Sequence, residues 1–144
     1  MRASKNQSNG AILQSSKTVI RTRNFKASIE FYTQLLQLVT LEKYNDGDGS
    51  RGAILRLGPE SSNAFIEISE IEQTHPYYQE PFSIALQNDK IDIQLRTADV
   101  TYWVNRLKGK CKMMGPVLHP WGSYYLYTRD PDGMQIIIYQ EKSK

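Results

Sequence analysis

The sequence predicts an α+β fold built from two repeated units, each with a strand, a helix and further strands. Residues 121–139 hold an Asp-Pro-Asp-Gly turn between two runs of aromatic and β-branched residues, which is typical of a β-hairpin. A similar cassette occupies residues 53–69, where two apolar runs flank a polar turn. An internal duplication is the simplest interpretation, and chance similarity of two short segments is the alternative.

The spacing of the two units supports the duplication. A strand that ends in a helix-capping residue precedes each hairpin, at residues 19–24 and 93–99. The caps Asn24 and Asp99 are 75 positions apart, and the hairpin residues Glu67 and Ile137 are 70 apart. We therefore predict a loose N-terminal tail at 1–14, a first unit at 15–72, a linker at 73–89 and a second unit at 90–144, together forming one structural domain.

Within each unit, hydrophobic periodicity predicts the elements. Residues 17–23 alternate as a half-buried strand, Asn24 caps a helix, and residues 38–44 form the next strand. In the second unit, residues 90–97 form a strand and Asp99 caps a helix that Gly109 ends. A further strand starts at 110–114, and Gly115-Pro116 interrupts it. The apolar stripes of the two helices are Phe25, Ile29, Tyr32 and Leu36, and Val100, Trp103, Val104 and Leu107.

Composition narrows the functional classes. The chain has 144 residues, one cysteine and a formal net charge of +3 that is scattered along the sequence. Cys111 alone cannot form an intrachain disulfide, and no apolar run is long enough for a membrane span. We expect a soluble, cytoplasmic protein that binds neither nucleic acid nor membrane.

The residues by themselves define no catalytic centre. His75 and His119 each precede a proline in a predicted loop, where a lone histidine is more often a surface residue than a base or a metal ligand. The sequence contains no phosphate-binding glycine loop, no zinc spacing and no recognisable nucleophile setting.

Several segments together resemble the glyoxalase/bleomycin resistance protein/dioxygenase group, the vicinal oxygen chelate superfamily. They are residues 21–32 with the Phe31-Tyr32 pair, Asp99, Pro120-Trp121-Gly122 and the turn at 130–133, and the resemblance covers roughly residues 17–141. It implies two βαβββ modules whose curved sheets enclose a cleft, usually in a homodimer.

Enzymes of that group hold a divalent metal through four side chains that face the cleft. Carried over by position, these sites fall on Lys17, Glu67, Asp92 and Ile137. Only Glu67 matches, because Lys17 presents a cation and Ile137 has no donor atom. The resemblance therefore implies no metal and no other cofactor, assigns no catalytic residue, and favours a protein that is not an enzyme.

The resemblance still predicts a cleft, and the strand period predicts which side chains line it. If Glu67 and Ile137 face it, the strand period of two puts Phe65, Gln135 and Tyr139 beside them. The same period directs Ile66, Ile68, Ile136 and Ile138 toward the helices. It also predicts that Arg21 faces the cleft. The predicted ligand-binding residues are Trp121, Phe65, Glu67, Arg56, Asp92, Gln94, Arg96 and Tyr139. Such a lining suits a planar, partly polar molecule.

Metal-free members of the group include the bleomycin resistance proteins, which sequester an antibiotic without turnover. The favoured hypothesis is a small-molecule, antibiotic-binding homodimer of this type, with an anionic or neutral ligand because the chain is net basic. The alternative is a lyase, isomerase or dioxygenase-like enzyme with a degenerate or atypical site, in which Glu67 or Asp92 acts as a general base or a degenerate metal site remains. A scaffold with a vestigial cleft is a third possibility.

Overall fold

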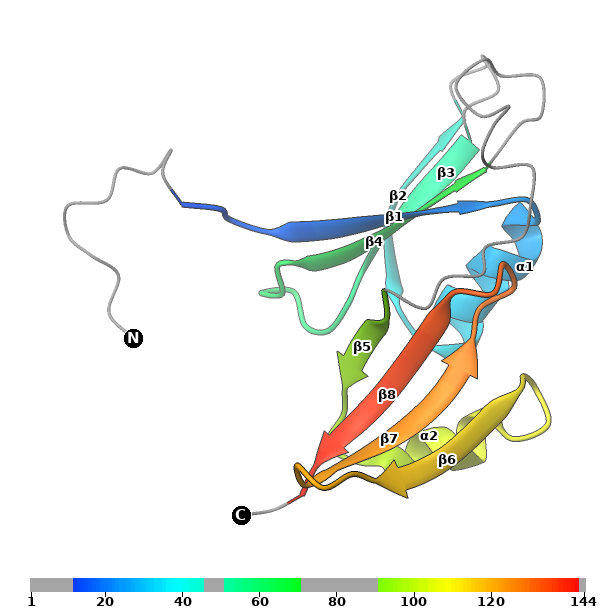
Figure 1. The fold of residues 1–144 in the computed structure, drawn as a ribbon. Helices are drawn as coiled ribbons and strands as arrows, with labels where there is room; N and C mark the ends of the chain where they lie inside the picture. Colours follow the sequence, from blue (N-terminus) through cyan, green and yellow to red (C-terminus); the bar gives the residue numbers. More distant parts are fainter. Residues whose placement is uncertain (1–11, 46–50, 71–90, 143–144) are drawn as a thin grey trace.

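The computed structural model describes residues 12–45, 51–70 and 91–142. It contains two four-stranded sheets with the orders β1-β4-β3-β2 and β5-β8-β7-β6 (Figure 1). The first module comprises β1 (Ser16–Thr22), α1 (Phe25–Ile29), η2 (Glu30–Leu35), β2 (Val39–Asn45), β3 (Arg51–Arg56) and β4 (Ala64–Glu70). The second comprises β5 (Ile93–Arg96), α2 (Val100–Leu107), β6 (Met113–Leu118), β7 (Ser123–Arg129) and β8 (Gln135–Glu141). The identical strand order confirms the predicted α+β fold of two repeated βαβββ modules.

The strand register confirms which residues face the helices. In each module the first strand runs parallel to the last, and the remaining pairs are antiparallel. The side chains of Ile66, Ile68, Ile136 and Ile138 are all buried. Their neighbours Phe65, Glu67, Gln135 and Tyr139 are half-buried. This alternation places the polar and aromatic side chains on the faces of the sheets that point away from the helices.

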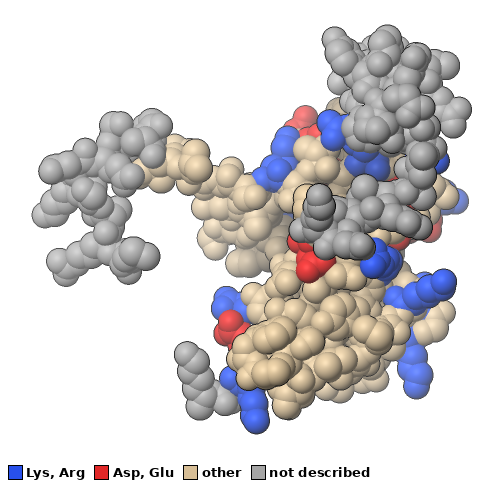
Figure 2. Space-filling model, viewed as in Figure 1, with Lys and Arg blue, Asp and Glu red and all other residues tan. Residues whose placement is uncertain are grey.

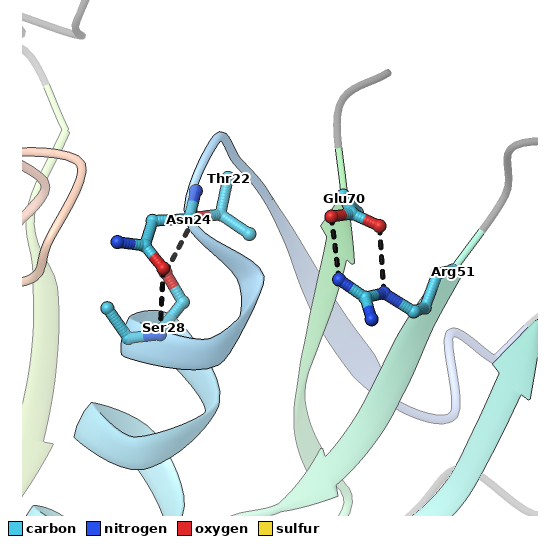
Figure 3. A network of polar contacts seen from close by, with 6 residues as sticks. Thr22, Asn24, Ser28, Arg51 and Glu70 are labelled. Atoms are coloured by element: carbon cyan, nitrogen blue, oxygen red, sulfur yellow. Dashed lines mark hydrogen bonds and ion pairs between the residues drawn. The ribbon is translucent and has the colours of Figure 1, made fainter.

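Polar contacts fix the start of α1, as the sequence predicted. The side chain of Asn24 accepts a hydrogen bond from the backbone N–H of Ala27 at 3.1 Å. The fully buried hydroxyls of Thr22 and Ser28 lie 2.7 Å apart. Figure 3 shows this turn beside the two-pronged ion pair between Arg51 and Glu70, which joins β3 to β4. The N-cap therefore satisfies helix N–H groups that would otherwise lack a partner.

The first helix changes its pitch in a way that the apolar stripe did not reveal. After Ile29 it continues as the π-helix η2, in which the N–H of Leu36 donates to the carbonyl oxygen of Phe31. The neighbouring residues Phe31 and Tyr32 within this turn are both buried, at 4% and 0% exposure.

The second module differs from the prediction at two strands. Strand β5 begins at Ile93, so Asp92 precedes the strand instead of lying within it. Strand β6 begins at Met113 and continues through Gly115-Pro116, where the sequence predicted an interruption. The pairing with β7 shifts register between Met114 and Val117. This β-bulge accommodates the proline, which cannot donate to a neighbouring strand, without ending the strand.

The turn between β7 and β8 joins the two modules. The Asp130 carboxylate is 5% exposed and accepts a hydrogen bond of 2.7 Å from the hydroxyl of Tyr32. Asp132 accepts bonds from the hydroxyl of Ser28 and the backbone N–H of Arg23, each 3.2 Å long. One hydrophobic core includes buried residues of both modules. Among the helices that the structure describes, none is long and apolar enough to cross a membrane.

Candidate functional site

The exposed face of the second sheet is aromatic. Tyr125 and Tyr127 on β7 alternate with the buried Leu126, and Tyr139 on β8 pairs with Tyr125. The ring of Tyr125 lies 6.0 Å from that of Tyr127 and 5.9 Å from that of Tyr139. In Figure 1, α2 lies behind the sheet of β6, β7 and β8. Since Leu126 is buried on the helix side, the alternation of the strand directs the three rings to the other face.

Two further rings extend this face beyond the end of β6. The imidazole of His119 and the indole of Trp121 are stacked, with centroids 4.3 Å apart and an angle of 3° between their planes. His119 Nε2 lies 2.7 Å from the hydroxyl of Tyr127. The ring of Tyr125 is steeply inclined to both stacked rings, at 74° and 72°, with its centroid 4.7 Å from that of His119 and 5.6 Å from that of Trp121. We call the five residues His119, Trp121, Tyr125, Tyr127 and Tyr139 the aromatic patch.

The aromatic patch offers stacking surface together with hydrogen-bonding groups. Trp121 is 63% exposed, and His119 covers one face of its indole. Burial raises the pKa of the Tyr127 hydroxyl, so this group stays protonated at neutral pH and can donate or accept a hydrogen bond. In Figure 2 the surface over β6, β7 and β8 is largely free of charge, with Lys and Arg at its margins. Such a surface can hold a flat ring system by stacking.

The exposed face of the first sheet is polar. Lys17 Nζ lies 2.7 Å from Glu67 Oε1, and the Tyr44 hydroxyl lies 3.4 Å from Glu67 Oε2. The hydrogen bond to Glu67 raises the pKa of the Lys17 ammonium, which is therefore charged at neutral pH. Arg56 and Phe65 pair across the adjacent strands on the same face.

The structure divides the predicted ligand-binding residues between these two faces. Arg56, Phe65 and Glu67 lie on the first sheet, while Gln94, Arg96 and Tyr139 lie on the second. Trp121 follows β6, and Asp92 precedes β5 and accepts a hydrogen bond of 2.7 Å from the side chain of Gln135. Their role in binding remains a prediction.

Sequence reasoning missed three members of the aromatic patch. Tyr125 and Tyr127 could have been found, because they share the alternation that places Tyr139 on this face. His119 was expected to be a loop residue, and it does lie in the loop after β6, but its half-buried position between Trp121 and Tyr127 was not predicted. Its contacts depend on how β6 pairs with β7, which no local pattern encodes. His75 lies outside the described residues.

The family model for the Glyoxalase/Bleomycin resistance protein/Dioxygenase superfamily matches residues 14–138, so the chain belongs to this superfamily. Among solved structures, TnmS3, an antibiotic binding protein from Streptomyces sp. CB03234, is 22% identical with a TM-score of 0.67, over 92% of this chain and 98% of that one. A superfamily member from Sphaerobacter thermophilus is 18% identical with a TM-score of 0.70, over 90% and 98% of the two chains.

The trypanothione-dependent glyoxalase I of Leishmania major is 23% identical with a TM-score of 0.66, over 87% of this chain and 84% of that one. A comparison with curated proteins finds no match. At these identities the solved structures establish the shared fold, and they include both a binding protein and an enzyme.

The residues at the four positions where the resemblance implies metal ligands do not fit a divalent ion. The ammonium of Lys17 already pairs with the carboxylate of Glu67, and it would repel a second cation. Ile137 offers only hydrocarbon and is 2% exposed. Across the described ranges, no group of three or more His, Cys, Asp or Glu side chains is arranged to hold a metal. A site of this composition lacks the donors that a hard divalent ion requires.

Proposed function

We propose that this protein binds a planar, partly polar small molecule of the antibiotic type and sequesters it without metal. The aromatic patch is the observation that carries the proposal. Five rings gather on one exposed sheet face, and an exposed indole supplies a large contact area with few rotors to immobilise. The similarity to the fold of TnmS3, an antibiotic binding protein, supports the same assignment.

The polar groups beside the rings define the character of the ligand. The hydroxyl of Tyr127 and the ring of His119 can hydrogen-bond to oxygen atoms at the edge of a flat molecule. On the first sheet, the Lys17 ammonium keeps N–H donors beyond the one that it directs at Glu67. We therefore propose an aromatic ligand that carries carbonyl, hydroxyl or acidic groups and is neutral or anionic overall.

We further propose that the protein acts as a homodimer in the cytoplasm. The edge strands β2 and β6 expose apolar side chains that a second copy could cover: Val39, Leu41, Met114, Val117 and Leu118. Multi-angle light scattering at micromolar concentration is expected to give twice the 16.6 kDa chain mass. A mass of one chain would contradict this part of the proposal.

A thermal-shift screen tests the binding function. The purified protein is screened against antibiotics and aromatic metabolites, with and without a chelator. A compound at 100 times its dissociation constant should stabilise the protein by about 2.7 kcal/mol, and the chelator should not alter the shift. No stabilisation across a broad library would contradict the proposal and would favour a scaffold with a vestigial cleft.

The second candidate function is the alternative predicted from the sequence, an enzyme of the same superfamily. The cluster of Lys17, Tyr44 and Glu67 favours it, because it places a carboxylate, an ammonium and a phenol on one exposed face. Asp92, the other carboxylate predicted as a general base, belongs to the second module. Incubation of each stabilising compound with the protein, followed by mass spectrometry, separates the candidates. A stoichiometric, unchanged ligand supports sequestration, and multiple turnovers support an enzyme.

A further inference from the structure

A cavity lies away from the aromatic patch. It is a groove of about 550 Å³ between the first module's helix and the second module, and it contains no residue of the patch. Its helix wall includes Glu30, Phe31 and Leu35, and its opposite wall includes Lys110, Cys111 and Arg129. A volume of this size falls in the range of small-molecule sites.

The two walls carry opposite charges. Glu30 is exposed on the helix wall, whereas Lys110 and Arg129 are exposed on the other wall. Within the part of the chain that the structure describes, neither Glu30 nor Lys110 forms an ion pair. Arg129 donates to Gly133 O and to Gln135 Oε1, which leaves other N–H groups of its guanidinium available.

Both walls of the groove also carry apolar side chains. Phe31 is 4% exposed, and Leu35 and Cys111 are half-buried. Asp130 also borders the groove, but its oxygens already accept bonds from Tyr32 and from the backbone N–H groups of Asp132 and Met134. The groups able to bind a ligand are therefore one anion, two cations, the amide of Gln34 and the apolar part of the lining.

We propose that this groove is a second small-molecule site, which takes an elongated amphipathic zwitterion of dipeptide size. The ammonium group of the ligand pairs with Glu30, and its carboxylate pairs with Lys110 and Arg129. Apolar side chains of the ligand cover Phe31 and Leu35. A molecule with a single charge would satisfy only one wall, which is why the charge pattern selects a zwitterion. The ligand would bridge the two modules.

Cys111 provides a local reporter for this site. It is the only cysteine of the chain, so alkylation by a maleimide, followed by mass spectrometry, measures access to the groove alone. The probe is leucylphenylalanine, compared with its N-acetyl derivative, which lacks the ammonium, and its C-terminal amide, which lacks the carboxylate. We expect the free dipeptide to slow alkylation at saturation and each capped form to bind about three- to tenfold more weakly. Calorimetric titration of the same peptides gives a reading that does not depend on thiol reactivity.

Charge-neutral variants test the two walls separately. Glu30→Gln should weaken the free dipeptide but leave the N-acetyl form unaffected, and Lys110→Gln should weaken the free dipeptide but leave the amide unaffected. Glu60→Gln and Lys108→Gln are matched controls, because both residues are exposed and neither lines the groove. Circular dichroism confirms that each variant is folded.

Two results would overturn the inference: no protection and no binding heat up to the solubility limit of the dipeptide, or equal binding of the free and capped forms. Trp121→Ala distinguishes this site from the aromatic patch, since the variant should keep full protection of Cys111 by the dipeptide. The two proposals can therefore be refuted independently: the dipeptide can fail to bind in the groove while the antibiotic-type ligand binds to the aromatic patch, or the dipeptide can bind while the antibiotic-type ligand does not.

Discussion

Replacement of Tyr32 by Phe tests the contact that joins the two modules. Tyr32 has no exposed surface, and its hydroxyl donates a hydrogen bond of 2.7 Å to the Asp130 carboxylate, which is 5% exposed. Phe preserves the ring and its packing, but it leaves the buried carboxylate with one donor fewer. Because a hydrogen bond to a charged group contributes about 1.5–3 kcal/mol, we expect Tyr32→Phe to lower the free energy of unfolding by about 2 kcal/mol.

The pH dependence of this loss has a definite sign. Burial raises the pKa of the Asp130 carboxyl above its usual value, and the hydrogen bond from Tyr32 opposes that rise. A raised folded-state pKa contributes stability that is full below the unfolded pKa and is lost as the pH rises through the folded pKa. Removal of the Tyr32 hydroxyl raises the pKa of Asp130 further. The gap in stability between wild type and variant should therefore be widest above both folded-state pKa values of Asp130. It should narrow as the pH falls through these values, which both lie above the ordinary aspartate pKa.

Urea unfolding at neutral and acidic pH measures both effects. Asp130→Asn removes the buried charge, so Tyr32→Phe should cost only about 1 kcal/mol in that background, as expected for a bond between neutral groups. Tyr102→Phe is the control, because Tyr102 is 45% exposed and its loss of a hydroxyl should change stability by less than about 0.5 kcal/mol. A Tyr32→Phe variant as stable as this control at neutral pH would refute the reasoning.

Three further predictions concern local features. Gly52→Ala should destabilise the fold by about 1–3 kcal/mol in urea unfolding, because a Cβ there would clash with the Tyr44 ring and lie 2.6 Å from Ile68 O; unchanged stability would show that β3 can shift. Asp99→Ala should cost about 1 kcal/mol through loss of the α2 cap to the Tyr102 N–H, and an equal effect of Asp99→Asn would be inconsistent with capping. Elemental analysis should find no stoichiometric divalent metal, since Lys17 occupies one expected ligand position and pairs with Glu67; one zinc, nickel, iron or manganese per chain would contradict this.

The sequence predicted the parts of the fold that depend on local periodicity. Buried Ile66 and Ile68 alternate with Phe65 and Glu67, and this pattern assigned the two faces of β4 once the resemblance had placed Glu67 toward the cleft. The helix caps were predicted for the same reason, since a capping side chain bonds to an N–H only three residues away.

Features that depend on distant partners could not be predicted. The π-helix turn at η2 could not be read from the spacing of the apolar residues, and the bulge at Gly115-Pro116 becomes visible only against the register of β7. The Asp-Pro-Asp-Gly turn was recognised as a local reversal. Its carboxylates, however, bond to Ser28 and Tyr32, about 100 positions earlier in the chain. His119 likewise joins the aromatic patch through residues on another strand.

The central claim is that a ligand binds on the aromatic patch. The most direct test is calorimetric titration with the compound that stabilises the protein most in the thermal-shift screen. Trp121→Ala should weaken binding by roughly 1–3 kcal/mol, or about 5- to 150-fold, with little change in melting temperature, since the indole is 63% exposed. Trp103→Phe is the matched control: Trp103 is half-buried and donates to Thr97 Oγ1, so this change should lower the melting temperature and leave affinity intact. If Trp121→Ala instead lowers the melting temperature sharply and leaves affinity unchanged, Trp121 is structural and the ligand binds elsewhere.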